Sequence, residues 1–139
     1  MSYMADRQVI CEQPSTTIAL DSTGDKKTFF IPFNCVVQRI GCTITTALTV
    51  TAVVIAFDRR PLPGSDTGRG DADVGTLTAP AAAQVVGRTL YDDVQVNLKG
   101  GEEVVVEVTT AASAGAGLPF LEITPRAEEP ANDSEFISA

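Results

Sequence analysis

Short runs in which apolar and polar side chains alternate recur along this chain, and turn-forming residues separate them. The most regular are residues 93–98 and 104–109, where Val or Leu occupies every second position. Alternation with a period of two is typical of a strand that buries one face. The two runs flank residues 99–102, Lys-Gly-Gly-Glu, so the pattern predicts a β-hairpin over residues 93–108.

Weaker strand patterns account for much of the remaining chain. The strand predicted over residues 35–44 has an apolar face that Gln38 interrupts. One face of this strand is expected to hold Val36, Ile40, Cys42 and Ile44. The other face is expected to hold Val37, Arg39, Gly41 and Thr43. Residues 50–57 form an almost continuous apolar run, which predicts a strand buried on both faces. Further strands are expected at residues 16–20, 27–33, 75–80 and 120–124.

About eight short strands without a convincing amphipathic helix predict an all-β fold, an antiparallel two-sheet β-sandwich. The abundance of Val, Ile and Thr supports this prediction, because β-branched side chains pack well on pleated sheets. Among such sandwiches the jelly roll recurs in viral capsid and lectin domains, and it is the type expected here.

The sandwich domain is expected to span residues 16–125, between two polar ends. Residues 1–15 show no period and contain Pro14, so they are expected to form an extended arm that becomes ordered on assembly. Residues 126–139 are acidic and are expected to form a flexible, solvated tail. Within the sandwich, residues 58–75 hold four Asp, four Gly and two Pro, which predicts a long exposed loop.

The chain carries 10 basic and 18 acidic residues and no histidine, for a formal net charge of −8. An acidic surface repels phosphate backbones and anionic lipids, so neither nucleic acid nor a membrane is an expected partner. The absence of histidine removes the usual general base and the usual metal ligand. We therefore expect no enzymatic activity, no cofactor and no metal. The first ten residues lack the apolar segment of a signal peptide, and residues 50–57 are too short to span a bilayer.

The three cysteines lack the CxxC spacing of a metal or redox motif. Cys35 and Cys42 lie in strand-like runs and are expected to be small buried side chains, which favours a reducing intracellular origin. Cys11 lies in the predicted arm and is the cysteine expected to be exposed. No histidine is present to activate it, so a catalytic role is not expected.

The loop predicted over residues 58–75 carries the exposed candidates Arg60, Asp66, Arg69, Asp71 and Asp73. Residues 69–71 read Arg-Gly-Asp, an integrin-binding tripeptide, but three residues match by chance often and a solvated turn is the simpler explanation. The three aspartates from 66 to 73 could offer oxygen ligands to Ca²⁺. No glutamate closes an EF-hand pattern, so solubility at a loop tip is the simpler role.

Two further groups have a simple structural explanation. An acidic group is expected on a solvated face, because paired-carboxylate chemistry requires a cleft: Glu102, Glu103 and Glu107. Phe29, Phe30 and Phe33 are expected in the core. The alternative is that one of them anchors a contact with another subunit or with a capsid, as aromatic side chains do at interfaces.

Several segments of the second half match one family of proteins. They are residues 75–80 (Gly-Thr-Leu-Thr-Ala-Pro), residues 94–108, Gly115, Gly117 and residues 121–123 (Leu-Glu-Ile). With these segments the chain resembles the jelly-roll auxiliary proteins of tailed-bacteriophage heads, namely capsid decoration (cement) proteins and the bases of head fibres. In that family the turn before the Gly-bearing loop is often Ala-Gly-Asp, whereas here it is Gly-Gly-Glu. The resemblance covers roughly residues 27–125.

The resemblance implies a homotrimer on the outer capsid surface of a virion, where it contacts the major capsid protein and stabilises the head lattice. A net charge of −8 fits this placement, because an inward-facing protein would meet packaged DNA. In this interpretation the N-terminal arm is the anchor and adds a strand to a neighbour's sheet. The candidate capsid-binding residues are Ser2, Tyr3, Met4, Arg7, Val9, Ile10 and Pro14.

Two alternatives to capsid decoration remain. The first is a carbohydrate-binding or host-attachment module of a virion. Sugar sites usually need aromatic platforms, and this chain has no Trp and two tyrosines, Tyr3 and Tyr91. The second is an enzyme on a jelly-roll scaffold, such as a cupin-like oxygenase, which would need a metal triad containing histidine.

Overall fold

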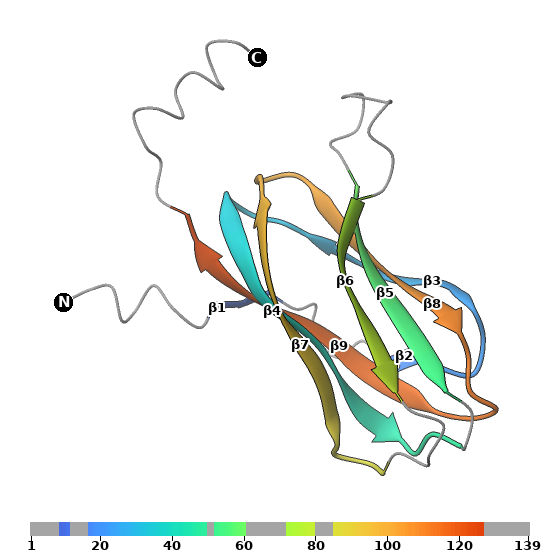
Figure 1. Ribbon diagram of the computed structural model, residues 1–139. Coiled ribbons are helices and arrows are strands. Elements are labelled where there is room, and N and C mark those ends of the chain that lie inside the picture. Colours follow the sequence, from blue (N-terminus) through green and yellow to red (C-terminus); the bar gives the residue numbers. More distant parts are fainter. Residues whose placement is uncertain (1–8, 12–16, 50–51, 61–71, 80–84, 127–139) are drawn as a thin grey trace.

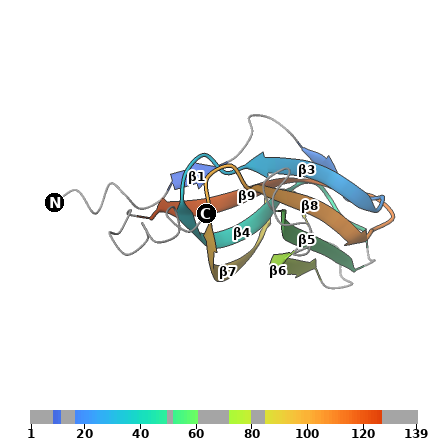
Figure 2. The ribbon, with the colours of Figure 1, turned by 90° about the horizontal axis from the view of Figure 1, so that it is seen from above.

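Two antiparallel β-sheets lie face to face in the computed structural model, which describes residues 9–11, 17–49, 52–60, 72–79 and 85–126 (Figure 1). Figure 2 shows the two layers from above. Sheet A has the strand order β1-β9-β4-β7, with β2 also paired to β9, and sheet B has the order β3-β8-β5-β6. The strands are β1 (Val9–Cys11), β2 (Ile18–Ala19), β3 (Gly24–Phe30), β4 (Cys35–Thr46), β5 (Val53–Arg60), β6 (Ala72–Ala79), β7 (Thr89–Leu98), β8 (Glu103–Thr110) and β9 (Ala116–Pro125). Within the described ranges, no helix is long and apolar enough to cross a membrane.

The nine strands of the described residues fill eight positions in the sandwich. Both β1 and β2 pair with the same edge of β9, β1 opposite Leu121–Ile123 and β2 opposite Ala116 and Gly117. They therefore act as one interrupted edge strand, and each sheet has four positions. The predicted all-β, antiparallel two-sheet sandwich is confirmed.

The predicted hairpin over residues 93–108 is wrong, although both of its strands exist. β7 pairs with β4 in sheet A, whereas β8 pairs with β3 and β5 in sheet B. The Gly-Gly turn therefore carries the chain from one sheet to the other. Period-two alternation shows that each strand buries one face, and a strand can do this against an opposing sheet without pairing with its neighbour in sequence. The pattern thus specifies the buried face but not the partner.

An apolar layer between the sheets holds the strands together. In β5 the inward residues Val53, Ile55 and Phe57 are buried, whereas the residues between them are half-buried. The prediction that residues 50–57 are buried on both faces is therefore wrong. The strand buries one face and begins at Val53, and residues 50–51 lie outside the described part of the chain.

The loop predicted over residues 58–75 is wrong at both of its ends, and residues 61–71 lie outside the described part of the chain. β5 continues through Arg60, and β6 begins at Ala72. Arg60 and Asp73 are therefore strand residues, because the two strands stay paired beyond the apolar core, where no hydrophobic alternation marks them. The other three loop candidates lie outside the described residues: Asp66, Arg69 and Asp71.

Part of the predicted N-terminal arm is a strand of this chain's own sheet. Val9 and Ile10 lie in β1, which pairs with β9 of the same molecule. The arm predicted over residues 1–15 is therefore wrong at these positions, because the edge of β9 offers unpaired backbone groups to a short apolar segment. The remaining anchor candidates lie outside the described residues: Ser2, Tyr3, Met4, Arg7 and Pro14.

Phe29 and Phe30 are neighbours in β3 that face opposite sides, with 0 % and 59 % of their surface exposed. Phe29→Ala is expected to lower the free energy of unfolding by about 3–5 kcal/mol, because it deletes a buried ring and leaves a cavity. Phe30→Ala is the matched control and is expected to change it by less than about 0.5 kcal/mol. Urea unfolding followed by circular dichroism measures both, and equal losses would contradict the assignment of the two faces.

Candidate functional site

An exposed aromatic corner lies at one end of the sandwich, where β3 passes to β4. It consists of Phe30, Pro32 and Phe33, of which Phe30 is 59 % and Phe33 37 % exposed. The expectation that the phenylalanines of this segment lie in the core is confirmed for Phe29 and wrong for Phe30 and Phe33. Phe30 points outward because it follows an inward residue in β3, and Phe33 lies beyond the end of that strand.

Hydrogen bonds hold the aromatic corner against the turn between β7 and β8. The amide of Ile31 donates to the carbonyl of Glu102 at 2.9 Å, and the amide of Gly101 donates to the carbonyl of Ile31 at 2.7 Å. The amide of Gly100 donates to Oδ1 of Asn34 at 3.0 Å. Gly101 has a φ of 94°, a conformation that favours glycine. The corner is therefore presented in one fixed arrangement.

Glu102 organises the same turn, and the prediction that it belongs to a solvated acidic face is wrong. Its surface is 3 % exposed, and its Oε1 accepts a hydrogen bond from the amide of Lys99 at 2.7 Å. Its Oε2 lies 3.9 Å from Nε of Arg59 on β5. A buried carboxylate requires such partners, so the role of Glu102 is to tie the turn to sheet B. Glu103 and Glu107 are half-buried on β8.

A register fault crosses sheet A at Gln38. Between Val37 and Arg39, strand β4 has one residue, Gln38, whereas β9 has none at this level and β7 has two. At this level the number of extra residues therefore rises by one from each strand to the next, from none in β9 to one in β4 and two in β7. A bulge of this kind disrupts the ladder, bends the strand and redirects side chains.

The fault reverses the alternation of β4. Before it the inward residues are Cys35 and Val37, and after it they are Ile40, Cys42 and Ile44. The predicted faces of residues 35–44 are therefore wrong ahead of the fault, where Val36 and Val37 exchange sides. Two consecutive residues, Gln38 and Arg39, are half-buried and line the same outer hollow.

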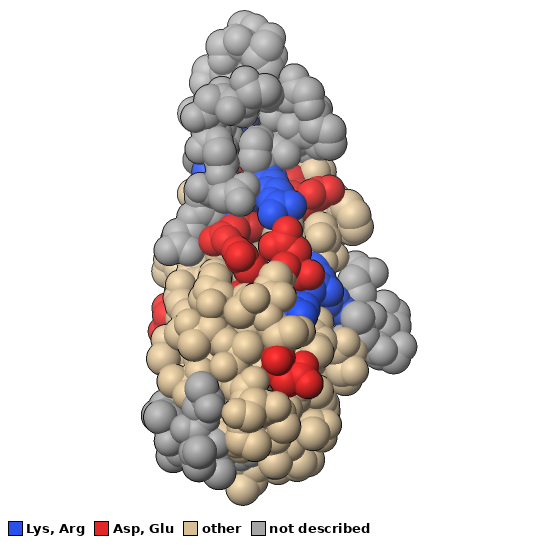
Figure 3. All heavy atoms as spheres, turned by 90° about the vertical axis from the view of Figure 1, so that its right-hand side faces the viewer, with Lys and Arg blue, Asp and Glu red and all other residues tan. Residues whose placement is uncertain are grey.

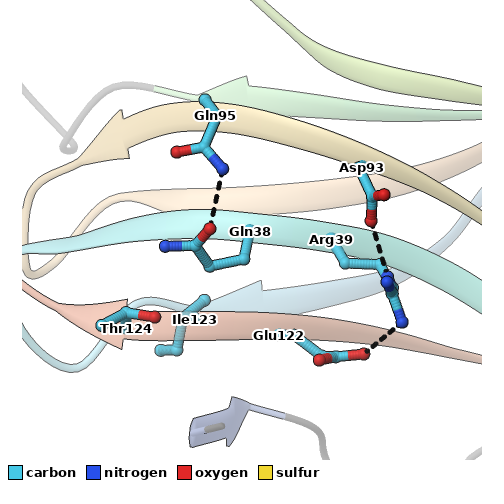
Figure 4. Close-up of a pocket in the computed structure, with 7 residues that line it drawn as sticks. All are labelled: Gln38, Arg39, Asp93, Gln95, Glu122, Ile123 and Thr124. Atoms are coloured by element: carbon cyan, nitrogen blue, oxygen red, sulfur yellow. Dashed lines mark hydrogen bonds and ion pairs between the residues drawn. The ribbon is translucent and has the colours of Figure 1, made fainter. Parts of the chain in front are cut away.

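This hollow, called the face hollow below, lies on the outer face of sheet A and has a volume of about 440 Å³ (Figure 4). The polar side chains that line it are Gln38, Arg39, Asp93, Gln95, Glu122 and Thr124. Nε2 of Gln95 donates to Oε1 of Gln38 at 2.7 Å. Nε of Arg39 donates to Oδ1 of Asp93 at 2.8 Å, and another nitrogen of its guanidinium lies 3.6 Å from Oε2 of Glu122. The hydrogen bond to Asp93 raises the pKa of Arg39 above its ordinary value.

Two aromatic rings lie one row away from this polar cluster. Tyr91 of β7 and Phe120 of β9 are both in register with Gly41 of β4. A Cβ atom at position 41 would overlap the ring of Phe120, so the glycine allows this ring to lie over the strand. Tyr91 is 57 % exposed, and the guanidinium of Arg39 lies 4.5 Å from the centroid of its ring. Arg39 therefore connects the tyrosine with the face hollow.

A second hollow, the edge hollow, lies between the edge strands β6 and β7 and has a volume of about 450 Å³. Leu77 and Leu90 are buried residues that line it. Its polar residues are Thr76, Thr78, Arg88, Thr89 and Asp92. Tyr91 lines this hollow as well. The same tyrosine thus borders the edge hollow and contacts Arg39 of the face hollow.

An ion pair lies on the outer face of sheet B. An Arg60 guanidinium nitrogen donates to Oδ2 of Asp25 at 3.0 Å, and this ion pair crosses β8, which lies between their strands. Val105 of β8 is 1 % exposed although it alternates with inward residues. In the register of the sheet it lies midway between Glu107, which is opposite Asp25, and Glu103, which is opposite Arg60. Figure 3 shows the molecule from this side, with charged side chains gathered across its middle.

The cysteines of β4 are structural. Cys35 and Cys42 are buried, which confirms the prediction of small buried side chains. Burial raises the pKa of the Cys42 thiol from its ordinary value of 9.0 to about 12, so the thiol stays protonated near neutral pH. Cys11, expected in an extended arm, lies in β1 opposite Leu121.

Sequence reasoning did not find the face hollow. Its residues come from three strands that are distant in the chain, so no linear motif joins Gln38, Gln95 and Glu122. One signal was present, because Gln38 interrupts the apolar face of its predicted strand, and the register fault lies at that residue.

The strand order defines a jelly-roll β-sandwich, in which the chain passes repeatedly between two facing sheets. Searches find no matching protein-family model and no matching curated protein. Among solved structures the chain is similar to the Eiger TNF structure from S. frugiperda, with a TM-score of 0.50 and 10 % sequence identity over 89 % of this chain and 97 % of that one. At this identity the similarity supports the fold alone, and the predicted jelly-roll type of sandwich is confirmed.

The raised pKa of Cys42 predicts a loss of stability at alkaline pH. The native thiol holds its proton up to about pH 12, whereas the thiol of the unfolded chain releases its proton near pH 9. The contribution of the buried, protonated thiol to the free energy of unfolding is therefore complete below pH 9 and declines as the pH rises towards 12. Urea unfolding of the wild type and Cys42→Ala should show that the stability difference between them changes by about 1.4 kcal/mol per pH unit in this range. A difference that stays constant from pH 7 to about pH 11 would contradict the burial of this thiol.

Proposed function

We propose that this chain is a non-enzymatic structural protein of a virion, which binds the outer capsid surface and stabilises the head lattice as a decoration, or cement, protein. The observation that carries the proposal is the aromatic corner. Phe30 and Phe33 expose large apolar surfaces at one end of the sandwich, next to the exposed Pro32. Exposed aromatic side chains grouped in this way are typical of protein–protein contacts.

The rigidity of the corner favours binding. Association costs free energy when loops and side chains must become ordered at an interface. Here the hydrogen bonds from Ile31, Gly100 and Gly101 fix the backbone before any partner arrives. The rings can therefore act as anchors whose removal from water is not offset by a large loss of chain entropy.

The proposed partners are the major capsid protein and two further copies of this chain. A module that binds only the assembled shell stabilises the shell by linkage. In a homotrimer, three weak corner contacts act together through their high effective concentration. The anchor candidates outside β1 remain a predicted second contact: Ser2, Tyr3, Met4, Arg7 and Pro14. The net charge of −8 supports placement on the outside, away from packaged DNA.

Co-sedimentation with capsids assembled without this protein tests the proposal. The wild type is expected to attach stoichiometrically, and the double variant Phe30→Ser/Phe33→Ser is expected to bind at least about tenfold more weakly, a loss of roughly 1.4 kcal/mol or more. Light scattering of the free protein should give three times the chain mass of 14.6 kDa.

The matched control is Val85→Ser/Val86→Ser. These valines are 66 % and 62 % exposed, but they lie next to the start of β7, at the end of the sandwich opposite the aromatic corner. Their variant is expected to attach like the wild type. Equal losses in both double variants, or a wild type that does not attach to capsids, would overturn the proposal.

A carbohydrate-binding or host-attachment module of a virion is the second candidate function. The small number of aromatic residues that could serve as sugar platforms counts against this candidate. One observation favours it nevertheless: Tyr91 is 57 % exposed and lies between two hollows lined by polar side chains.

A further inference from the structure

We propose that the face hollow and the edge hollow together form a binding site for a neutral oligosaccharide, with Tyr91 as the platform between them. The inference rests on the second candidate function and gives it a location and a ligand class. It does not depend on attachment to a capsid, because the aromatic corner contributes no residue to either hollow.

The face hollow offers hydrogen-bonding groups suited to vicinal hydroxyls. In the amide pair, Gln38 keeps its NH₂ group and Gln95 keeps its carbonyl oxygen without a partner among the described residues. Asp93 and Glu122 each use one oxygen on Arg39 and keep the other. A sugar hydroxyl both donates and accepts, so adjacent hydroxyls can bond to a carboxylate oxygen and to an amide group at once.

Arg39 covers one face of the platform ring and holds it in place. The guanidinium of Arg39 lies 4.5 Å from the centroid of the Tyr91 ring, and Asp93 fixes that guanidinium by a 2.8 Å hydrogen bond. The exposed part of the ring is thus an apolar surface beside polar groups. Such a surface can pack against the C–H face of a pyranose ring while the hydroxyls at its rim bond to the hollow.

The edge hollow extends the site beyond one sugar. Thr76, Thr78 and Thr89 bring hydroxyl groups to it, and Asp92 brings a carboxylate. The two volumes, about 440 and 450 Å³, each lie within the range of roughly 300–1,000 Å³ that is typical of small-molecule sites. Because Tyr91 lies between them, a linear ligand can reach both hollows by crossing β7 at this residue.

Charge selects among the possible saccharides. The two hollows hold three carboxylates, of Asp92, Asp93 and Glu122, against two guanidinium groups, of Arg39 and Arg88. Asp93 and Glu122 already neutralise Arg39, and the whole chain carries a net charge of −8. An anionic sugar would meet repulsion from both sources, which leaves neutral sugars as the fitting class.

The test measures binding of the full-length protein to an array of neutral and acidic oligosaccharides. Titrations followed by NMR then use maltotetraose, cellotetraose, tetra-N-acetylchitotetraose, their monosaccharides and tetragalacturonate. At least one neutral oligosaccharide is expected to bind and to shift the amide signals of Tyr91 and Gln95. It should bind at least about tenfold more tightly than its monosaccharide, because its units engage both hollows together. Absence of binding by every neutral glycan, or stronger binding of acidic ones, would overturn the inference.

Variants locate the site. Tyr91→Ala and Gln95→Leu are each expected to weaken binding of that oligosaccharide at least about tenfold. Thr110→Ala changes an exposed residue of β8 in sheet B that lines neither hollow, and it is expected to leave binding unchanged. Tyr91→Ala should still attach to capsids, so that failure here and failure of the decoration proposal are separable. If Tyr91→Ala instead abolishes trimer formation, this face is a contact between copies of the chain and the inference is wrong.

Discussion

The two sheets share one apolar layer, and this layer controls how the rest of the molecule is arranged. Each strand has one face committed to the layer and one face available for other contacts. The register fault at Gln38 illustrates the constraint. The chain keeps the layer filled by placing Val37 inward before the fault and Ile40 after it. Two consecutive side chains, Gln38 and Arg39, are then left for the outer hollow. The face hollow is therefore a consequence of keeping the core continuous across an irregular strand.

The turns that connect the sheets are subject to the same constraint. Facing sheets lie about 10 Å apart, so a chain that passes from one to the other needs a turn that both bends sharply and has its polar groups satisfied. The Gly-Gly turn does this with a positive φ at Gly101 and with the buried carboxylate of Glu102. The same turn supplies the hydrogen bonds that fix Ile31 and Asn34. The rigidity of the aromatic corner is thus a product of the crossing between sheets.

These relations explain which features could be predicted from the sequence. Alternation predicted the strands around Val94 and Val106 and the buried cysteines, and the number of strands predicted the sandwich, because all of these depend on one buried face per strand. The strand with which β8 pairs could not be predicted from this alternation. Val104 and Val106 would be buried equally well if β8 lay next to β7 in one sheet or faced it from the other sheet. Phe30 is exposed because it follows the inward Phe29 in the same strand and so lies on the opposite face. The hydrophobicity of the two side chains is equal and does not show which of them faces inward. The face hollow depends on register across three strands, and a single strand's sequence contains no information about its neighbours' register.

The two proposed binding surfaces are compatible in one molecule. The aromatic corner lies just before Cys35, at the start of β4, and Tyr91 is in register with Gly41 of the same strand. Gly41 follows Cys35 by six positions of extended chain, which corresponds to about 20 Å at roughly 3.3 Å per residue. A chain attached to a shell through its corner would therefore hold the saccharide site about 20 Å from the attachment point, on the flank of the sandwich. Because no residue belongs to both surfaces, occupation of one leaves the contacts of the other intact, and the free energies of the two binding events are expected to add.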